Sequence, residues 1–174
     1  SYTEGVGGTV SGAGKVYYNQ KASLTASAKT GYTFGGWYTS SNVSGTPVAT
    51  GTTYSPAITG DVTYYAKFSV QSYQITVNPN GATGGTNLSG WYSAPGTAAS
   101  AINGVTSSRT ITMVYGSTLK MTAPEKTGYT FNGWSRTSGS TGTLNSTTGD
   151  STYLCGAGAA TLTAQWTAKV YTIT

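Results

Sequence analysis

An internal duplication is the feature that most constrains how this chain folds. The segment Lys29-Thr-Gly-Tyr-Thr-Phe-Gly-Gly-Trp37 returns as Lys126-Thr-Gly-Tyr-Thr-Phe-Asn-Gly-Trp134, with eight of nine positions identical and an offset of 97 residues. The flanking residues match as well, since Thr52–Tyr54 aligns with Ser151–Tyr153. Self-similarity at a long fixed period is typical of repeat arrays, in which each repeat is one supersecondary unit.

The duplication predicts two repeats and the beginning of a third. The first repeat covers 1–69 and has a divergent, glycine-rich opening strand, and the second covers 70–167 with an insertion at about 86–109. The last residues, Tyr171–Thr174, resemble Tyr73–Thr76, which lie 98 positions earlier. Residues 168–174 are therefore expected to be the first strand of a following repeat, or a linker.

The hydrophobic pattern predicts strands. Apolar residues alternate with polar ones in Tyr73–Val77, Val62–Phe68, Leu162–Trp166 and Ile111–Tyr115, which is the period of a half-buried strand. Charged residues make up only 7% of the chain, against about 25% in an average soluble domain, and no segment shows sustained helical periodicity. The predicted fold class is predominantly β, α+β at most.

Large aromatic side chains recur at matching places in both repeats. We interpret them as core residues, because aromatic side chains dominate the packing of small cores, and the alternative is a ligand-binding platform. The predicted core set is Trp37, Phe68, Trp134, Trp166, Tyr32, Tyr129, Phe34 and Phe131.

The composition argues against catalysis and against metal or cofactor binding. The chain has no His, the commonest general base and metal ligand, and only four Asp and Glu residues. No spacing suggests a calcium or zinc site, and the Gly-rich stretches lack the residues of a phosphate-binding loop. The single Cys155 is expected to be buried and unreactive. We therefore expect no enzymatic activity, no metal and no cofactor.

The charge pattern gives no sign of nucleic-acid binding. The formal net charge is +5, but the nine Lys and Arg residues are spread singly along the chain, whereas a nucleic-acid footprint is a basic stripe or patch. The sequence also shows no signal peptide and no membrane span.

The insertion is the main candidate for ligand binding. It contains adjacent aromatics, Trp91 and Tyr92, in a turn-rich segment, and function often resides in such loops. Exposed aromatic rings would stack on a sugar while Asn87 supplies hydrogen bonds. In the interpretation that we favour, Trp91 and Tyr92 instead fold back to cover the sheet. Residues 96–103, which are rich in Ala, are expected to form one short helical turn.

The repeated motif resembles a known family. An opening Tyr-x-Ile-Thr strand with Asn-Gly (73–81), the segment Gly-Tyr-Thr-Phe-x-Gly-Trp (126–134) and a closing aromatic strand (161–166) resemble the internalin-type B repeat, or Listeria–Bacteroides repeat. In the first repeat, 29–37 and 62–68 carry the resemblance. It implies tandem β-grasp-like repeats with one short helix or helical turn, no catalytic residues, and a place on the bacterial exterior.

These features predict a non-catalytic tandem repeat of a bacterial surface or secreted protein, acting as a stalk or spacer and as an adhesion module. The alternative is a carbohydrate- or host-protein-binding domain that works through Trp91 and Tyr92. The expected partners are neighbouring repeats of the same chain and, for adhesion, glycans or host surface proteins. A pure stalk repeat is expected to tolerate loss of the insertion.

Overall fold

The computed structural model describes residues 2–3, 6–137 and 139–174, and this part of the chain contains strands and turns but no helix. The predominantly β prediction is confirmed. The short helix implied by the family resemblance is wrong for the described residues, and so is the helical turn predicted over 96–103. That segment instead contains β10 (Thr97–Ala98) and the start of β11 (Ile102–Val105), because its backbone pairs with neighbouring strands.

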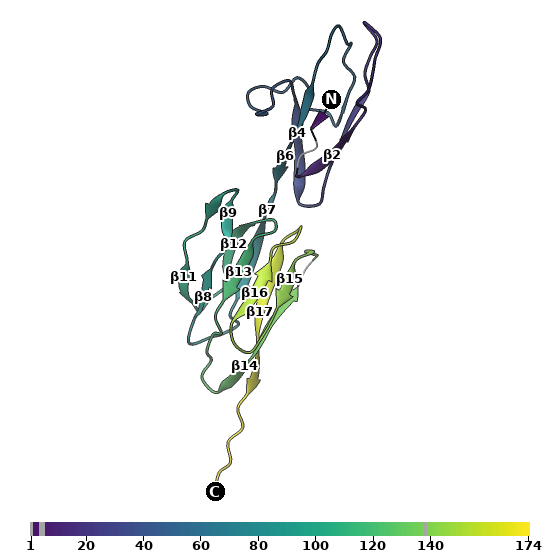
Figure 1. Ribbon diagram of the computed structural model, residues 1–174. Coiled ribbons are helices and arrows are strands. Elements are labelled where there is room, and N and C mark those ends of the chain that lie inside the picture. Colours follow the sequence, from purple (N-terminus) through teal and green to yellow (C-terminus); the bar gives the residue numbers. More distant parts are fainter. Residues whose placement is uncertain (1, 4–5, 138) are drawn as a thin grey trace. The chain divides into compact units, whose positions relative to one another are not determined.

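The chain divides into two compact units, Ser1–Gln71 (unit 1) and Ser72–Thr174 (unit 2), and each contains one copy of the duplicated motif (Figure 1). Each unit also has its own cluster of buried apolar side chains. In the described residues, no helix is long and apolar enough to cross a membrane.

Unit 1 consists of two three-stranded sheets. In the first, β6 (Tyr64–Val70) lies between β1 (Tyr2–Thr3), which is parallel to it, and β4 (Tyr32–Tyr38), which is antiparallel. In the second, β3 (Leu24–Ala28) lies between β2 (Gly8–Ser11) and β5 (Thr53–Tyr54). The buried cluster between them is small and consists of Val10, Leu24, Ala26 and Trp37.

Unit 2 has a larger core built from two sheets. The four-stranded sheet has the order β12 (Arg109–Val114), β7 (Ser72–Asn78), β17 (Ala160–Ala168), β14 (Tyr129–Thr137), and its central pair, β7 and β17, is parallel. The five-stranded sheet has the order β11, β8 (Thr86–Ser89), β13 (Thr118–Met121), β16 (Ser151–Leu154), β15 (Thr143–Asn145). A short β9 (Tyr92–Ala94) pairs with β10.

The duplicated Phe-x-Gly-Trp segment forms a β-bulge in each unit. The register slips between Phe34 and Gly36 in β4, and between Phe131 and Trp134 in β14. Because a bulge inserts one extra residue, two aromatics three positions apart face the same side of the sheet. Their rings meet edge to face, with centroids 5.6 Å apart in unit 1 and 5.8 Å apart in unit 2. The bulge in this motif therefore directs both aromatic rings toward the core.

The Gly of this motif is required by the bulge. Gly36 has a φ of 122° and Gly133 has a φ of 96°, a region that other residues rarely adopt. A Cβ on Gly133 would also lie 2.5 Å from the hydroxyl of Ser146, and that hydroxyl accepts a hydrogen bond from the backbone N–H of Trp134.

The aromatic residues of the predicted core set differ in their burial. Trp37, Trp134 and Phe131 are buried, and Phe34, Phe68 and Trp166 are partly buried against the two clusters. Tyr32 is half-buried. The structure contradicts the placement of Tyr129, whose side chain is 38% exposed. Tyr129 begins β14, where the sheet extends past the core. The ammonium nitrogen of Lys126 lies 4.4 Å from the centre of its ring.

Candidate functional site

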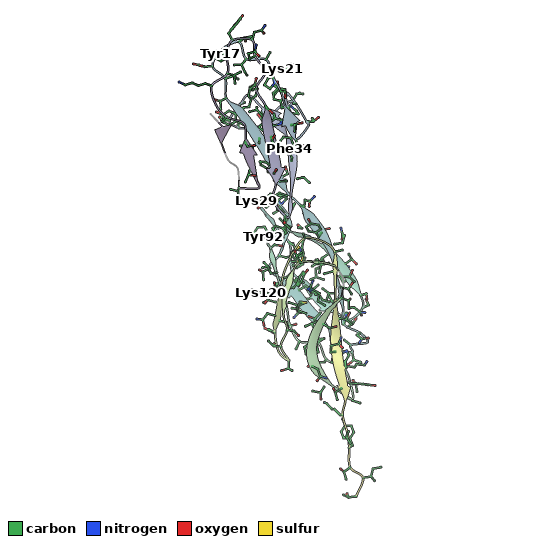
Figure 2. All side chains as sticks on the ribbon, turned by 90° about the vertical axis from the view of Figure 1, so that its right-hand side faces the viewer. Tyr17, Lys21, Lys29, Phe34, Tyr92 and Lys120 are labelled. Carbon is green, nitrogen blue, oxygen red and sulfur yellow. The ribbon has the colours of Figure 1, made fainter. Side chains whose placement is uncertain are left out.

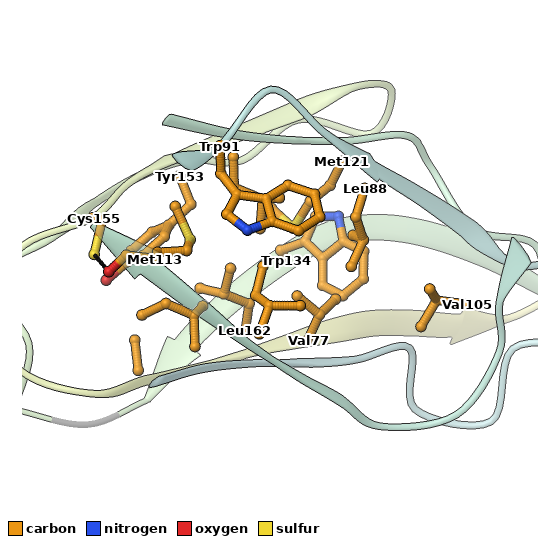
Figure 3. Packing of buried hydrophobic residues seen from close by; sticks show 14 of the residues in the cluster. Val77, Leu88, Trp91, Val105, Met113, Met121, Trp134, Tyr153, Cys155 and Leu162 are labelled. Atoms are coloured by element: carbon orange, nitrogen blue, oxygen red, sulfur yellow. Dashed lines mark hydrogen bonds between the residues drawn. The ribbon is translucent and has the colours of Figure 1, made fainter. Parts of the chain in front are cut away.

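Trp91 of the insertion lies inside unit 2. Its side chain is 3% exposed and belongs to the core cluster, where Figure 3 shows the indole among Met121, Leu88 and Trp134. The chain turns at Gly90, which has a φ of 84°, and the carbonyl of Trp91 then accepts a hydrogen bond from Ala99. The hypothesis that Trp91 stacks on a ligand at the surface is therefore corrected: its side chain is part of the fold.

Tyr92 and Asn87 do not join Trp91 in one surface. Adjacent residues of a strand point to opposite faces, and Tyr92, which follows Trp91, is 45% exposed (Figure 2). The side-chain oxygen of Asn87 accepts a hydrogen bond from the backbone of Gly104, and its backbone N–H donates to the Thr122 hydroxyl. Asn87 thus fixes the irregular β8–β11 pair. Tyr92 and Asn87 are both exposed, but the side-chain oxygen of Asn87 already holds the backbone of Gly104.

The insertion as a whole is a structural part of unit 2. Leu88 and Trp91 are 0% and 3% exposed, Val105 is buried, and β8 pairs with β13. The Thr86 hydroxyl is also buried and donates to the carbonyl of Thr122 at 2.6 Å. Because the insertion contributes these buried side chains, we expect removal of 86–109 to open the core, in contrast to the tolerance expected of a pure stalk repeat.

Unit 1 contains an open cavity of about 920 Å³. Leu24 and Trp37 line it from the core, residues 10–17 line it from β2 and the following loop, and residues 60–64 line it from the start of β6. Tyr17 stands at this end of the unit, at the opposite end from Lys29 (Figure 2). A volume of this size falls within the range of about 300–1,000 Å³ that is usual for ligand pockets.

Comparison of the two units explains the cavity. In unit 2, Leu88 pairs with Met121, and both side chains are buried. Leu24 is the counterpart of Met121, and the β2–β3 register places Gly12 beside Leu24, so a residue without a side chain replaces Leu88. Unit 2 also adds β12, whose Ile111 and Met113 enter the core. In unit 1, the residues that follow β2 up to Tyr17 form a loop.

A second hollow in unit 2 has an aromatic and cationic lining. The ammonium of Lys126 lies 4.4 Å from the ring centre of Tyr129 and 5.8 Å from that of Trp166, and it donates to the carbonyl of Asn80 at 3.3 Å. The hollow is also lined by Phe131 and Tyr171, and it measures about 570 Å³. We call these residues the aromatic–lysine surface. Sequence reasoning missed it because we assigned Tyr129 and Trp166 to the core.

Across residues 2–3, 6–137 and 139–174, no group of three or more His, Cys, Asp and Glu side chains is placed to hold a metal ion. Cys155 is 1% exposed, its sulfur lies 3.7 Å from the carbonyl oxygen of Met113 (Figure 3), and burial raises the pKa of its thiol to about 11. The thiol is therefore protonated at neutral pH and, being buried, unreactive.

The architecture is that of an all-β tandem repeat protein. Comparison of the sequence with models of known protein families identifies its family. The Listeria–Bacteroides repeat domain matches residues 1–67, and the divergent InlB B-repeat domain matches residues 94–170. The chain belongs to this repeat family of bacterial surface proteins, as the sequence motif predicted. No curated protein and no solved structure matches the chain.

Proposed function

We propose that this chain is a non-catalytic spacer of an extracellular bacterial protein, in which successive repeats extend an adhesive part away from the cell. The observation that carries the proposal is that the family motif occurs twice, each time inside a unit with its own core. In a repeat array, stability is approximately the sum of the repeats and their nearest-neighbour terms, so length is changed by adding copies.

A surface-display experiment tests the spacer role. The chain is placed once, twice or three times between a wall anchor and an epitope tag, and the distance of the tag from the cell wall is measured by super-resolution imaging. The proposal expects the distance to grow with each copy. A disordered Gly/Ser linker of the same residue count is the control, because the end-to-end distance of a flexible chain grows only as about the square root of its length. A tag distance that follows the linker control contradicts the proposal.

An adhesive role of the chain itself is the second candidate, and the aromatic–lysine surface favours it over the insertion. Exposed aromatic rings beside a cation are suited to sugar rings, and this hollow also contains the carboxylate of Glu125, which can accept hydrogen bonds from sugar hydroxyls. The partner class is therefore a glycan. Binding to a glycan array is expected to be lost in Tyr129→Ala and kept in Tyr17→Ala, where Tyr17 is an 88% exposed tyrosine of unit 1. Equal binding by both variants contradicts this site.

The insertion is tested in the same screen through its accessible tyrosine. Tyr92→Ala removes an exposed side chain, so the fold is kept. If glycan or host-protein binding depends on the insertion, this variant loses it while Tyr17→Ala does not. Trp91→Ala is unsuitable for this purpose, because the loss of a buried indole destabilises unit 2, so a loss of binding would not report on contact with the ligand.

A further inference from the structure

We propose that Tyr54 and Tyr64 form an oxidative crosslinking site, at which a haem peroxidase with hydrogen peroxide joins the two phenol rings through one carbon–carbon bond. The two rings come from different sheets of unit 1, since β5 and β6 belong to separate sheets. The bond therefore connects these sheets covalently. The inference does not depend on the spacer role, because it concerns the chemistry of one pair of side chains.

The fold of unit 1 holds the two rings side by side. Tyr54 lies in β5, where it pairs with Leu24 of β3, and Tyr64 is the first residue of β6. Their ring centres are 5.3 Å apart and their planes meet at 86°, so the edge of one ring faces the other. Aromatic pairs favour this arrangement at separations of about 4.5–7 Å. The two rings thus lie next to each other in the folded chain without strain.

The phenol hydroxyl groups of the pair also adjoin. Burial raises the pKa of Tyr64, and the neighbouring Tyr54 raises it further, through its charge and through a hydrogen bond between the two side chains. Oxidised phenols couple at the ring carbons beside the hydroxyl group. Because the hydroxyl groups of Tyr54 and Tyr64 adjoin, these reactive carbons lie where the two rings meet.

The crosslinking reaction is a two-electron oxidation. The peroxidase removes one electron and one proton from each phenol, which gives two tyrosyl radicals. The radicals couple through one ring carbon each, so one carbon–carbon bond forms and two carbon–hydrogen bonds break. Both ring carbons release their hydrogen as a proton, and both phenol oxygens take up a proton again. Hydrogen peroxide accepts the two electrons and two protons and becomes two water molecules, so the product lacks two hydrogen atoms.

The surroundings of the pair favour coupling between these two rings. Tyr54 and Tyr64 are both half-buried, which favours a partner within the unit over one from a second molecule. The adjacent Tyr65 lies on the other face of β6, because successive side chains of a strand point to opposite faces, and it pairs with Tyr38 of β4. Tyr65 is therefore a tyrosine at nearly the same place in the chain that is not part of the proposed site.

Unit 2 has a single phenol at the corresponding place. Alignment of the two repeats matches Tyr54 with Tyr153 and matches Tyr64 with Leu162, which cannot take part in phenol coupling. The hydroxyl of Tyr153 instead lies 2.9 Å from that of Ser140. The pair therefore distinguishes unit 1 from unit 2, and unit 2 serves as an internal control for oxidation.

Peptide mapping of the oxidised chain tests the proposal. The full chain is treated at low concentration with a haem peroxidase and hydrogen peroxide, and the monomer is isolated and digested. Cleavage before Asp61 by an Asp-specific protease, combined with trypsin, separates 30–60, which contains Tyr54, from 61–67, which contains Tyr64. We expect mass spectrometry to find these two peptides joined, at the sum of their masses less two hydrogen atoms. Separate peptides after oxidation overturn the proposal.

Matched phenylalanine variants identify the coupled rings. Tyr54→Phe and Tyr64→Phe each keep a ring but remove the phenol, so both are expected to lose the joined peptides, while Tyr65→Phe keeps them. Circular dichroism before oxidation confirms that each variant is folded. The crosslinked monomer is also expected to unfold in unit 1 at a higher urea concentration, because a crosslink restricts the unfolded chain. Equal yields of joined peptides from Tyr64→Phe and Tyr65→Phe contradict the assignment.

Discussion

The same substitution at the two motif tryptophans is expected to have different costs. Trp37 and Trp134 occupy equivalent positions and are 1% and 4% exposed, so Trp→Phe removes a similar buried area in each unit. The indole N–H groups differ. That of Trp37 donates to the carbonyl of Gly51 at 3.0 Å, whereas that of Trp134 is buried with no hydrogen-bond partner in the described part of the chain.

The difference between the stability losses of the two variants measures the contribution of this hydrogen bond. Loss of the bond in Trp37→Phe costs about 1 kcal/mol net. Removal of an unpaired buried N–H in Trp134→Phe relieves about 1–3 kcal/mol of desolvation. The packing losses largely cancel in the comparison, so Trp37→Phe is expected to lower the free energy of unfolding of its unit by about 2–4 kcal/mol more than Trp134→Phe does.

Urea unfolding measured separately for each unit tests this expectation. Because a chain with two units need not unfold in one step, the transition is followed through assigned NMR signals of unit 1 and of unit 2. Each variant leaves the other unit unchanged, and that unit serves as an internal control. Equal losses of stability in the two variants, or a larger loss for Trp134→Phe, would refute the reasoning.

Three further predictions concern unit 2. Trp91→Ala is expected to lower its free energy of unfolding by about 3–5 kcal/mol and Tyr92→Ala by less than about 1 kcal/mol, as measured by urea unfolding. Gly133→Ala is expected to cost about 1–3 kcal/mol in the same assay because of its positive φ, while Gly139→Ala, whose Cβ would meet nothing, is the control. Burial raises the thiol pKa of Cys155 from 9.0 to about 11, so the unfolded chain loses this proton first and stability falls as the pH rises through that interval. Cys155→Ala is expected to lack this decline in a pH series of unfolding curves.

The duplication and the period-two alternation predicted the fold class because they report local properties of the chain. Alternation identified β7 and β12, whereas the bulge at the repeated Phe-x-Gly-Trp was seen only in the structure. The helical turn predicted over 96–103 is wrong because composition does not reveal the strands that form there. Gly96 and Gly104 have φ angles of 73° and 67°, β10 pairs with β9, and β11 pairs with β8, partners that local propensity does not reveal.

Which side chains reach the surface depends on the register of the paired strands. The sequence alone does not reveal that register. Whether Trp91 or Tyr92 faces the core follows from a single-residue choice, because a slip by one position exchanges the faces of a strand. Gly12 likewise shows its effect only when the β2–β3 register places it beside Leu24, in the position of Leu88. The cavity of unit 1 therefore emerged from the comparison of two folded repeats.

Force spectroscopy of the full chain, held by its two ends, tests most directly the claim that it is a tandem of independently folded units. We expect two unfolding events per molecule, with contour-length gains of at most about 25 nm for the 71 residues of unit 1 and about 35 nm for the folded part of unit 2. Trp37→Phe is expected to weaken one event and leave the other unchanged. A single event that releases the whole length, or one in which both parts respond to that substitution, would contradict the account.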